Sequence, residues 1–377
     1  MRELEKTGQF SKSIKMPRVY FDYFLQELQE DLTLSVKQSR NSTSGNDPIY
    51  QEIILACGMC FLAGDSVRIL SQLYGMSPNL CRRIINICLN SIDHNHNCAE
   101  LQVKLPTNKE LPAITQKWNK LSTSYGLFNG HMGGLDGWLP RTKNPLGVSN
   151  QSDYYSGHYQ CFGLNVQALC GPDLEFFYLA VAAPGKTNDI RAFGRCRGLI
   201  DRFNGLPDEY FISADNAYNL SRKVLIPFSG ADIDFGSNRD YNFYLSQLRI
   251  RIEMVCGMLT TTWRRLQMGL NYSNRKNSQI VQVCSKLHNF CICTNQLGTI
   301  GVVDEESFVP ADHNIDSLTG AGNSNANAAG VRGLLATSPL DDPMDVCVLD
   351  SSRRDAIVAK LASAGIKPLQ HNLARNG

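Results

Sequence analysis

Five strand-like segments between about residues 124 and 226 constrain the fold more than any other feature of this sequence. In chain order they read HMGGLDG, CFGLNVQALC, EFFYLAVAA, EYFISAD and KVLIPF. An arginine-rich helical pattern, NDIRAFGRCRGLIDRFNGL, separates the third segment from the fourth. A long helix is predicted from about 240 to 265, and another over 278–296. Strands that alternate with helices in this order predict a mixed α/β sheet with flanking helices.

Three acidic residues stand in apolar or strand-like parts of this region. Asp136 ends the first strand segment, Asp215 ends the fourth, and Glu253 lies near the middle of the long helix. A charge in such a place is costly unless it is paired or bound to a metal. In an RNase H-like sheet the first and fourth strands are neighbours and a later helix packs across them, so the three acids would converge. Chance is the competing interpretation, because some of the 35 acidic residues will always fall near strand ends.

A converging set of carboxylates is what a pair of Mg²⁺ ions needs, since hard divalent cations prefer oxygen ligands. One acid bridges both ions and each of the others holds one, and Asp136 is the predicted bridge. The glycines of GGLDGWLP, residues 133–140, would let a metal approach closely.

The region before the strands is predicted to be helical. Residues 16–36 carry an amphipathic pattern, and a polar linker follows over 37–48. Three helices are then expected: one from about 49 to 62, one that begins after Asp65 as its N-cap, and one that begins at Ser77 and runs to about Ser91.

The second and third of these helices, joined by a short turn, have the shape of a helix-turn-helix. The third helix presents a polar face that can enter a major groove, and its residues are Asn79, Arg82, Arg83 and Asn86. An ordinary three-helix bundle with a solvated face is the alternative interpretation.

Composition excludes several classes of protein. Apolar residues make up 43% and charged residues 19% of the 377 residues, which is the profile of a soluble globular protein. The longest apolar run, 53–63, is too short to span a bilayer, and the N-terminal residues have no apolar segment typical of a secretory signal. Residues 1–300 have a net charge of +6 and residues 301–377 a net charge of −4. A mildly basic body permits nucleic-acid binding.

The 13 cysteines are scattered and odd in number, which favours a reducing compartment over a disulfide framework. Cys57 and Cys60 form a CxxC that is typical of redox or zinc sites, but packed thiols in a buried helix are the favoured interpretation. His94, His96 and Cys98 form a second possible metal cluster, of a kind that short polar loops often produce.

Several segments resemble the Harbinger-type transposases and their domesticated nuclease relatives, a branch of the DDE superfamily endonucleases. LDG at 135–137 and ADNAY at 214–218 look like the first and second motifs of that family. NFYLSQLRIRIEMVCGMLTTTWRRL at 242–266 resembles its glutamate helix. YYSGHYQCFGLNVQALC, PGKTNDIRAF and KLHNF resemble intervening and closing segments in the same order. The resemblance covers roughly residues 50–296.

By this resemblance Asp136, Asp215 and Glu253 form the catalytic DDE triad, which holds Mg²⁺ or Mn²⁺. The implied activity is hydrolysis of DNA phosphodiesters followed by strand transfer, in which the freed 3′-hydroxyl attacks target DNA. The resemblance also implies that the helices over 49–93 are the helix-turn-helix of the family. The implied partners are double-stranded DNA with terminal inverted repeats, a Myb-like DNA-binding protein and further copies of the chain. The implied location is the nucleus.

Further candidate residues surround the triad. Arg249, one helical turn before Glu253, is expected to orient Glu253 or contact a DNA phosphate; a surface ion pair is the alternative. Asn188 and Asp189 sit at a strand-to-helix junction, where Asp189 is a possible cap, and His158 either faces the groove or packs within its own segment. A phosphate-tracking face is a further possibility, with a solvated helix face as its alternative; its residues are Arg191, Arg195, Arg197 and Arg202.

Two departures from the family pattern leave a second function open. Cys256 stands where the family often has phenylalanine, and Thr262 where it often has the lysine before the tryptophan matched by Trp263. The alternative to an active transposase nuclease is therefore a domesticated, catalytically silent DNA-binding or scaffold protein on the same fold.

The predicted domain layout has four parts. They are an N-terminal helix and linker (1–48), a helical helix-turn-helix-like domain (49–123), an RNase H-like DDE endonuclease domain (124–298), and an acidic tail (299–377). The tail is expected to be largely disordered around TGAGNSNANAAG and to contain a short helix with a serine cap in SSRRDAIVAKLASAGI.

Overall fold

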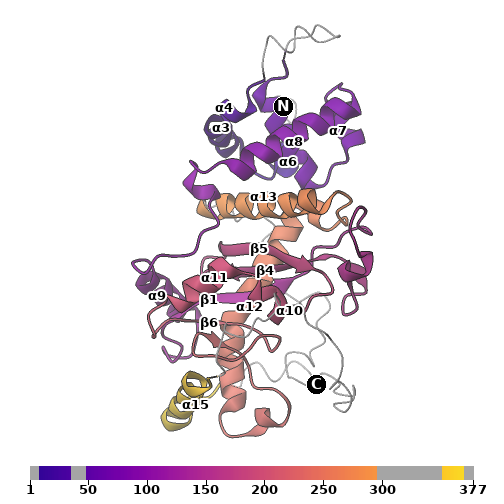
Figure 1. Cartoon of the computed structure of the whole chain (residues 1–377). Coiled ribbons are helices and arrows are strands. Elements are labelled where there is room, and N and C mark those ends of the chain that lie inside the picture. The colour runs from indigo at the N-terminus through magenta and orange to yellow at the C-terminus, as the bar shows by residue number, and fades with distance from the viewer. Residues whose placement is uncertain (1–7, 35–47, 295–349, 369–377) are drawn as a thin grey trace.

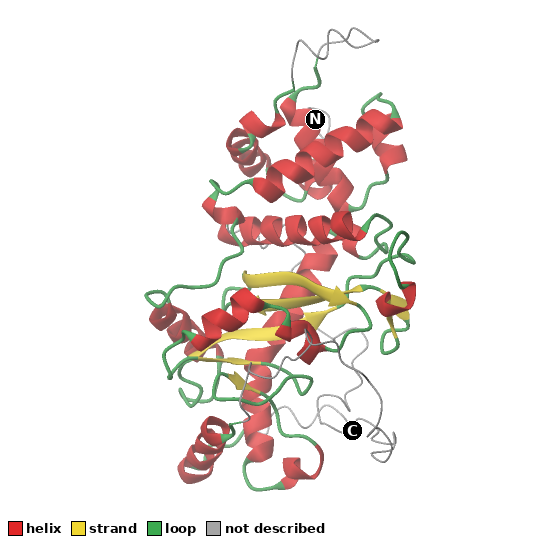
Figure 2. Cartoon of the chain, in the orientation of Figure 1, coloured by secondary structure: helices red, strands yellow, loops and turns green. Residues whose placement is uncertain are grey.

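The computed structural model describes residues 8–34, 48–294 and 350–368 (Figure 1). Most of the predicted linker over 37–48 and the low-complexity segment of the tail lie outside these residues. Within them, no helix combines the length and the apolar character needed to cross a membrane. Figure 2 shows a helical part at the top and a sheet with its own helices below it.

The upper part consists of short helices packed on a central apolar one. The helix expected over 16–36 is two helices, because the chain leaves helical geometry at Leu28. The bounds of the helices in this part are α2 Phe10–Ile14, α3 Arg18–Glu27, α4 Gln29–Leu32, α6 Gln51–Ala63, α7 Val67–Leu73 and α8 Pro78–His94.

Serine side chains begin both helices of the predicted helix-turn-helix. Ser77 accepts a hydrogen bond from the Leu80 backbone N–H at 3.2 Å and is followed by Pro78, as expected. The N-cap of α7 is Ser66, which accepts from the Ile69 N–H at 3.2 Å. Asp65 is therefore not the cap, because the chain enters helical geometry one residue later than the pattern suggested.

The cysteines of this part are packing residues. Cys57 and Cys60 are buried free thiols on α6. The helix crosses α8 closely at Gly58, where a Cβ atom would lie 2.2 Å from Cys88 Sγ, so a side chain there would force the two helices apart. The CxxC spacing thus reflects a tightly packed helix crossing, in line with the favoured interpretation.

Five strands form one mixed sheet in the order β5-β4-β1-β6-β7. β1 pairs antiparallel with β4 and parallel with β6, so the first and fourth strand segments of the sequence are neighbours, as expected. The bounds are β1 His131–Trp138, β4 Leu164–Cys170, β5 Phe176–Pro184, β6 Phe211–Ser213 and β7 Val224–Leu225. The mixed sheet with flanking helices fits the predicted RNase H-like arrangement. A separate ribbon, β2 Tyr155–Ser156 with β3 Cys161–Phe162, lies beside it.

Helices cover both faces of the sheet, because alternate strand residues face opposite layers. Val166 and Ala168 of β4 pack in one apolar cluster with Ile252 and Val255 of the long helix α12 (Asn238–Thr262). Leu169 packs in another cluster with residues of α10 (Asp189–Gly194) and α11 (Arg197–Asn204). A helix absent from the sequence prediction, α9 (Leu111–Leu121), packs against β1. Figure 1 shows α12 crossing the sheet.

The helix α13 (Asn274–Cys293) lies between the upper helices and the sheet (Figure 1). Its KLHNF segment joins them. The ammonium of Lys286 bonds to the backbone of Asp93 near the end of α8. Asn289 exchanges two hydrogen bonds with the Phe176 backbone of β5, at 2.8 and 2.9 Å. His288 Nε2 lies 2.8 Å from the carbonyl oxygen of Leu174. The closing motif therefore holds the helical part against the sheet edge.

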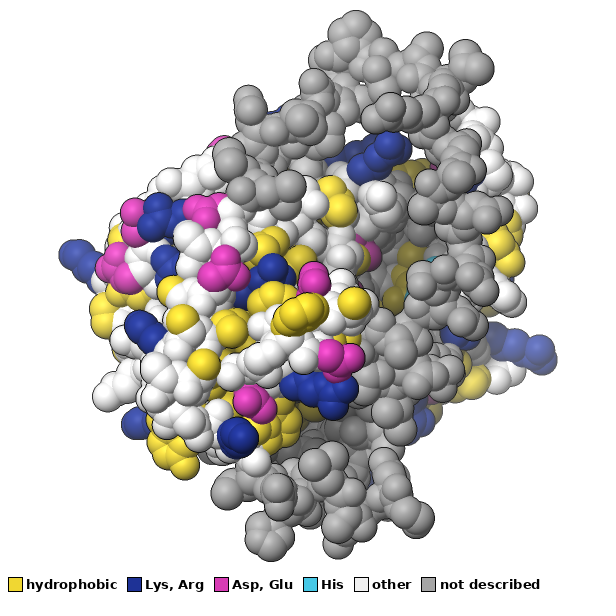
Figure 3. All heavy atoms as spheres, turned by 90° about the horizontal axis from the view of Figure 1, so that it is seen from below, with side chains coloured by type: hydrophobic (Ala, Val, Ile, Leu, Met, Phe, Trp, Pro, Cys, Tyr) yellow, Lys and Arg dark blue, Asp and Glu magenta, His cyan; other side chains and the backbone are white. Residues whose placement is uncertain are grey.

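The predicted terminal helix is α15 (Ser352–Ala364), which buries Ile357 and Leu361 against the lower end of α12. Its N-cap is Ser351, but the serine hydroxyl bonds to the Asp355 side chain and caps no backbone N–H. From below, acidic and basic side chains are interspersed over the visible part of this face (Figure 3), so the visible part does not form a basic surface.

Burial of His288 predicts a specific pH dependence of stability. Burial lowers the pKa of His288 to about 4, from 6.5 in the unfolded chain, and its Nδ1 has no partner among the described residues. As the pH falls below 6.5 the unfolded state takes up a proton that the folded state does not. We expect the free energy of unfolding to fall relative to that of His288→Gln by up to about 1.4 kcal/mol per pH unit. Urea titrations between about pH 7 and pH 4 measure the difference, and parallel curves would contradict it.

Candidate active site

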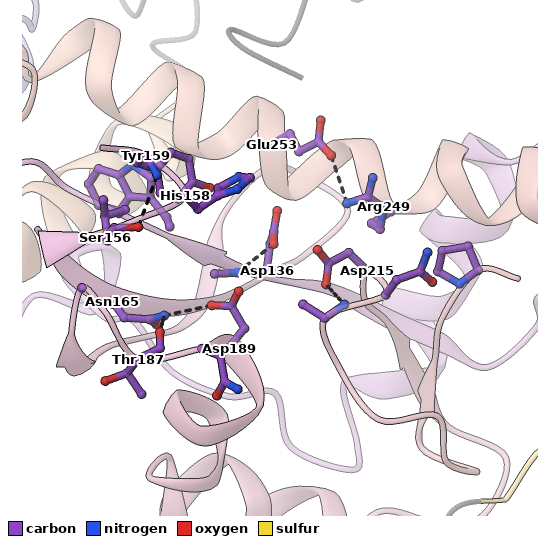
Figure 4. Close-up of a pocket in the computed structure, with 18 of the residues that line it drawn as sticks. Asp136, Ser156, His158, Tyr159, Asn165, Thr187, Asp189, Asp215, Arg249 and Glu253 are labelled. Carbon is purple, nitrogen blue, oxygen red and sulfur yellow. Dashed lines mark hydrogen bonds and ion pairs between the residues drawn. The ribbon is translucent and has the colours of Figure 1, made fainter. Parts of the chain in front are cut away.

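A cavity of about 590 Å³ opens where β1 and β6 end, beneath α12. Asp136, Asp215 and Glu253, the three acids expected to converge, all line it, and so does Arg249. Figure 4 shows Asp136 and Asp215 rising from the strand ends toward the face of α12 that carries the other two. Three segments that are distant in the sequence therefore contribute to one pocket.

Asp136 reaches the pocket because of the strand alternation in β1. The preceding even-numbered position, Gly134, faces Ile252 of α12, so Asp136 faces the same helix. It is half-buried, and its Oδ1 accepts a hydrogen bond from the Gly137 backbone N–H at 2.8 Å. Beyond Gly134 no pairing between β1 and β6 remains, so the side chain stands where the two strands part.

Asp215 lies in the loop that leaves β6. Its Oδ1 accepts a hydrogen bond from the Ala217 backbone N–H at 2.9 Å, and the Tyr218 N–H bonds to its carbonyl oxygen at 3.3 Å. These bonds form a tight turn that holds the carboxylate at the strand end. Parallel pairing of β1 with β6 then brings the two aspartates to the same edge of the sheet.

Glu253 enters the pocket from α12 and is already paired. Its Oε1 lies 3.1 Å from Nη1 of Arg249, one helical turn earlier. The two side chains are 13% and 17% exposed, so the alternative of a surface ion pair is wrong. The pair is mostly shielded from water, where ion pairs are screened less than at the surface.

Negative charge is crowded around Asp136. Burial, and after it the charge of Asp215, raise the pKa of Asp136 to about 8, with a further contribution from Glu253. Arg249 acts in the opposite direction and favours the ionised form of Asp136. The guanidinium of Arg249 therefore offsets negative charge on Asp136 as well as on Glu253, its ion-pair partner.

A hydrogen-bonded network of amides lies beside the carboxylates, and two of its members, Asn165 and Asp189, line the cavity (Figure 4). Asn165 and Gln167 of β4 both donate to Asp189 Oδ1, at 2.9 and 3.1 Å. Gln167 in turn accepts from the Tyr218 hydroxyl at 2.7 Å, which ties this network to the Asp215 loop. Sequence reasoning missed the two amides, although polar residues two apart in an apolar strand signal a shared polar face.

Asp189 lies directly against β1. A Cβ atom on Gly137 would fall 2.1 Å from Asp189 Oδ1, so only glycine leaves room for this carboxylate. At Gly133 a Cβ atom would fall 2.8 Å from the Cys170 carbonyl oxygen of β4. These two of the three glycines of β1 thus serve packing within the protein. The N-cap of α10 is Asn188, which accepts from the Arg191 N–H at 3.1 Å, so Asp189 is not the cap.

The rim of the pocket carries aromatic and basic side chains. His158 lines the cavity and also packs edge-on against the Tyr159 ring of its own segment, with 4.7 Å between centroids, so both of its interpretations describe it. Burial, and then the charge of Asp136, raise the pKa of Tyr159 to about 12. Trp138 also lines the pocket, and Lys186 is an exposed cation at its edge.

The four arginines predicted to form a phosphate-tracking face have different surroundings. Arg202 donates two hydrogen bonds to the carbonyl oxygen of Pro106, at 2.7 and 3.1 Å, and so serves the fold. Arg191, Arg195 and Arg197 are exposed. None of the four lines the cavity.

The polar face predicted on α8 is present but remote from the pocket. Its four residues are exposed, and Arg82 donates to Asn79 Oδ1 at 3.0 Å. Figure 1 shows α13 between α8 and the sheet, so this face and the carboxylates belong to separate regions of the surface. In the same part, His94 Nδ1 lies 2.9 Å from the carbonyl oxygen of Asn90, within its own helix.

Of the two departures from the family pattern, Cys256 lies beside the site and Thr262 lies inside the fold. Cys256 is half-buried, and burial followed by the nearby charge of Asp136 raises the pKa of its thiol. Thr262 is 3% exposed. A side chain at position 262 points into the core, so threonine there does not by itself remove a cation from the DNA-facing surface.

Comparisons with known proteins agree with this geometry. Residues 135–289 match the family model described as DDE superfamily endonuclease. The chain is similar to Protein ALP1-like of Arabidopsis thaliana, with 24% identity over 301 residues that cover 75% of this chain and 70% of the relative. No solved structure matches the chain significantly. The family match confirms the resemblance to DDE superfamily endonucleases that the motifs indicate.

Crowding at Asp136 predicts that its carboxyl group destabilises the cation-free protein. Since its pKa is about 8 in the folded state and about 3.8 unfolded, stability is lost as the pH rises through this range. We expect Asp136→Asn to raise the melting temperature in EDTA, by more at about pH 8 than at about pH 5. Differential scanning calorimetry measures the change. Asp201→Asn on the exposed face of α11 is the matched control, and an Asp136→Asn protein that melts lower than wild type at both pH values would contradict the prediction.

Proposed function

We propose that this protein is a transposase-derived endonuclease that cuts DNA phosphodiester bonds with the help of divalent cations, because residues 135–289 match the family model of the DDE superfamily endonucleases. The observation that carries the proposal is the convergence of Asp136, Asp215 and Glu253 on one pocket. We propose these three residues as the catalytic triad and as the cation ligands.

The donor set suits Mg²⁺ or Mn²⁺. The three side chains offer carboxylate oxygens, which hard divalent cations prefer, and the crowded charge around Asp136 is what a cation would relieve. The described part of the chain contains no group of three or more His, Cys, Asp or Glu side chains that is arranged to hold a metal ion. Glu253 is engaged with Arg249 instead.

Bound cations would supply an activated water and stabilise the charge on the leaving oxygen of a phosphodiester. The residues of the chain would do the rest. Asp136 and Asp215 would fix the ligand oxygens at the strand ends, where backbone N–H groups already orient one oxygen of each. Glu253 would close the site from α12. Lys186, exposed at the rim, would meet the negative backbone of the DNA.

DNA binding outside the pocket is assigned, in this proposal, to the exposed face of α8. The serine caps and short turn of α7 and α8 support a helix-turn-helix interpretation. We further propose that the protein acts in the nucleus on inverted terminal repeats, with a Myb-like DNA-binding partner and in more than one copy.

The second candidate function is DNA binding or scaffolding without cleavage. The engagement of Glu253 by Arg249, and Cys256 in place of the usual phenylalanine, are the observations that favour it. The two candidates share the fold and differ in whether the carboxylates perform chemistry.

Cleavage by the wild type and its loss in Asp136→Asn would distinguish the candidates. Purified protein is incubated with duplex DNA that carries the inverted repeats flanking its gene, in Mg²⁺ or Mn²⁺. We expect wild type and Asp201→Asn to nick it, and Asp136→Asn to be slower by about 100-fold or more, since the cations contribute several kcal/mol to the transition state. DNA binding and circular dichroism control for folding. Equal background cutting by wild type and Asp136→Asn would favour the silent protein.

Substitution on α8 tests the proposed DNA-binding face. Arg83→Gln removes an exposed cation that has no ion pair with any described residue, unlike the neighbouring Arg82, which bonds Asn79. We expect weaker DNA binding and a slope of log affinity against log salt that is smaller by about one. Fluorescence anisotropy at several salt concentrations measures both. Arg239→Gln, at an exposed site on α12 paired with Asp234, is the control, and identical slopes for wild type and Arg83→Gln would reject the assignment.

A further inference from the structure

Arg249 is a positive charge that lines the pocket beside its three carboxylates. It pairs with Glu253 at 3.1 Å, and its charge also favours the ionised form of Asp136. Asp215 adds negative charge on the same side of the helix (Figure 4). One guanidinium therefore offsets part of the charge of a whole carboxylate cluster in the cation-free protein.

A divalent cation and this guanidinium compete for the same carboxylate. Glu253 cannot keep a close ion pair with Arg249 and also serve as a cation ligand without bringing two positive groups together. At their low exposure, 13% for Glu253 and 17% for Arg249, solvent screens that repulsion weakly. A cation that takes Glu253 as a ligand is therefore expected to weaken the contact between Arg249 and Glu253.

The released guanidinium needs a new anionic partner, and the pocket is open to a DNA backbone. Arginine presents a planar fork of donors that matches a phosphate. Resting on the proposed function, we propose that Arg249 is a latch that holds Glu253 away from the cation until a DNA phosphate takes the guanidinium. Cation and DNA then bind cooperatively, and by linkage each raises the affinity of the other by the same factor.

A merely structural ion pair between Arg249 and Glu253 makes a different set of predictions. Loss of such a pair lowers stability and weakens any site built on Glu253. Loss of a latch also lowers the stability of the cation-free protein, because the carboxylates lose their counter-charge. It nevertheless tightens cation binding, because both the competition and the repulsion disappear. The opposite signs of the two effects exclude a merely structural pair, and the dependence of cation affinity on DNA identifies the latch.

The test compares wild type, Arg249→Gln, Arg249→Lys and Asp136→Asn, with Arg239→Gln as the control on the same helix. Melting temperatures are measured in EDTA, and Mn²⁺ affinity by isothermal titration calorimetry with and without a short phosphorothioate DNA duplex that resists cutting. We expect Arg249→Gln to melt lower than wild type in EDTA and to bind Mn²⁺ about tenfold more tightly. Arg249→Lys keeps the charge but not the planar fork of donors, so its melting temperature and its Mn²⁺ affinity should lie between those of wild type and Arg249→Gln.

The duplex is expected to tighten Mn²⁺ binding about tenfold in wild type and in Arg239→Gln, and to have little effect in Arg249→Gln. Mn²⁺ binding that is absent, or that Asp136→Asn leaves unchanged, would overturn the proposed function and the latch with it. Binding that depends on Asp136 but is equal or weaker in Arg249→Gln, or that the duplex does not tighten in wild type, would overturn the latch alone.

Discussion

The main physical constraint on this structure is the repulsion between carboxylates that the fold brings together at one edge of a sheet. The surrounding packing has to overcome that repulsion. Parallel pairing of β1 with β6 places Asp136 and Asp215 at adjoining strand ends, and α12 lays Glu253 above them. Burial and neighbouring charge raise the pKa of Asp136 far above that of an exposed aspartate. A fold selected for stability alone would not keep such an arrangement, because an apolar or amide residue would fill the same space at less cost. The crowding is therefore best understood as a functional requirement for a cation.

Packing around the site holds the carboxylates close together in spite of that repulsion. Tyr218 and Gln167 join the Asp215 loop to β4, and Gly137 lets Asp189 lie against β1. At the far side of the sheet, His288 and Asn289 of α13 bind the turn before β5 and its first residue. The same helix holds α8, so the position of the helical part relative to the carboxylates is built into the core.

The sequence predicted the elements that have a one-dimensional signature. Strand segments, the long helix, the order of the acids and the serine at the start of α8 all follow from local patterns, and the neighbouring positions of β1 and β6 follow from the fold class. The sequence did not predict contacts that form only when separate elements pack against one another. Asp189 looks like a helix cap in sequence, and its place beside Gly137 exists only once β1 and α10 are packed. The spacing of Arg249 and Glu253 allows either an orienting residue or a surface ion pair, and only the way α12 lies over the sheet decides between them by burying the pair.

Locating the cation would decide whether Asp136, Asp215 and Glu253 together form a divalent-cation site. Crystals of the full chain bound to the phosphorothioate DNA duplex and soaked in Mn²⁺ would give an anomalous difference map in which the ion is identified by its own scattering. We expect a peak within bonding distance of carboxylate oxygens from Asp136 and Asp215, with Glu253 turned from Arg249 toward it. An empty pocket in Mn²⁺-soaked crystals, with the Arg249–Glu253 pair intact and the phosphate of a bound DNA duplex in place, would contradict it.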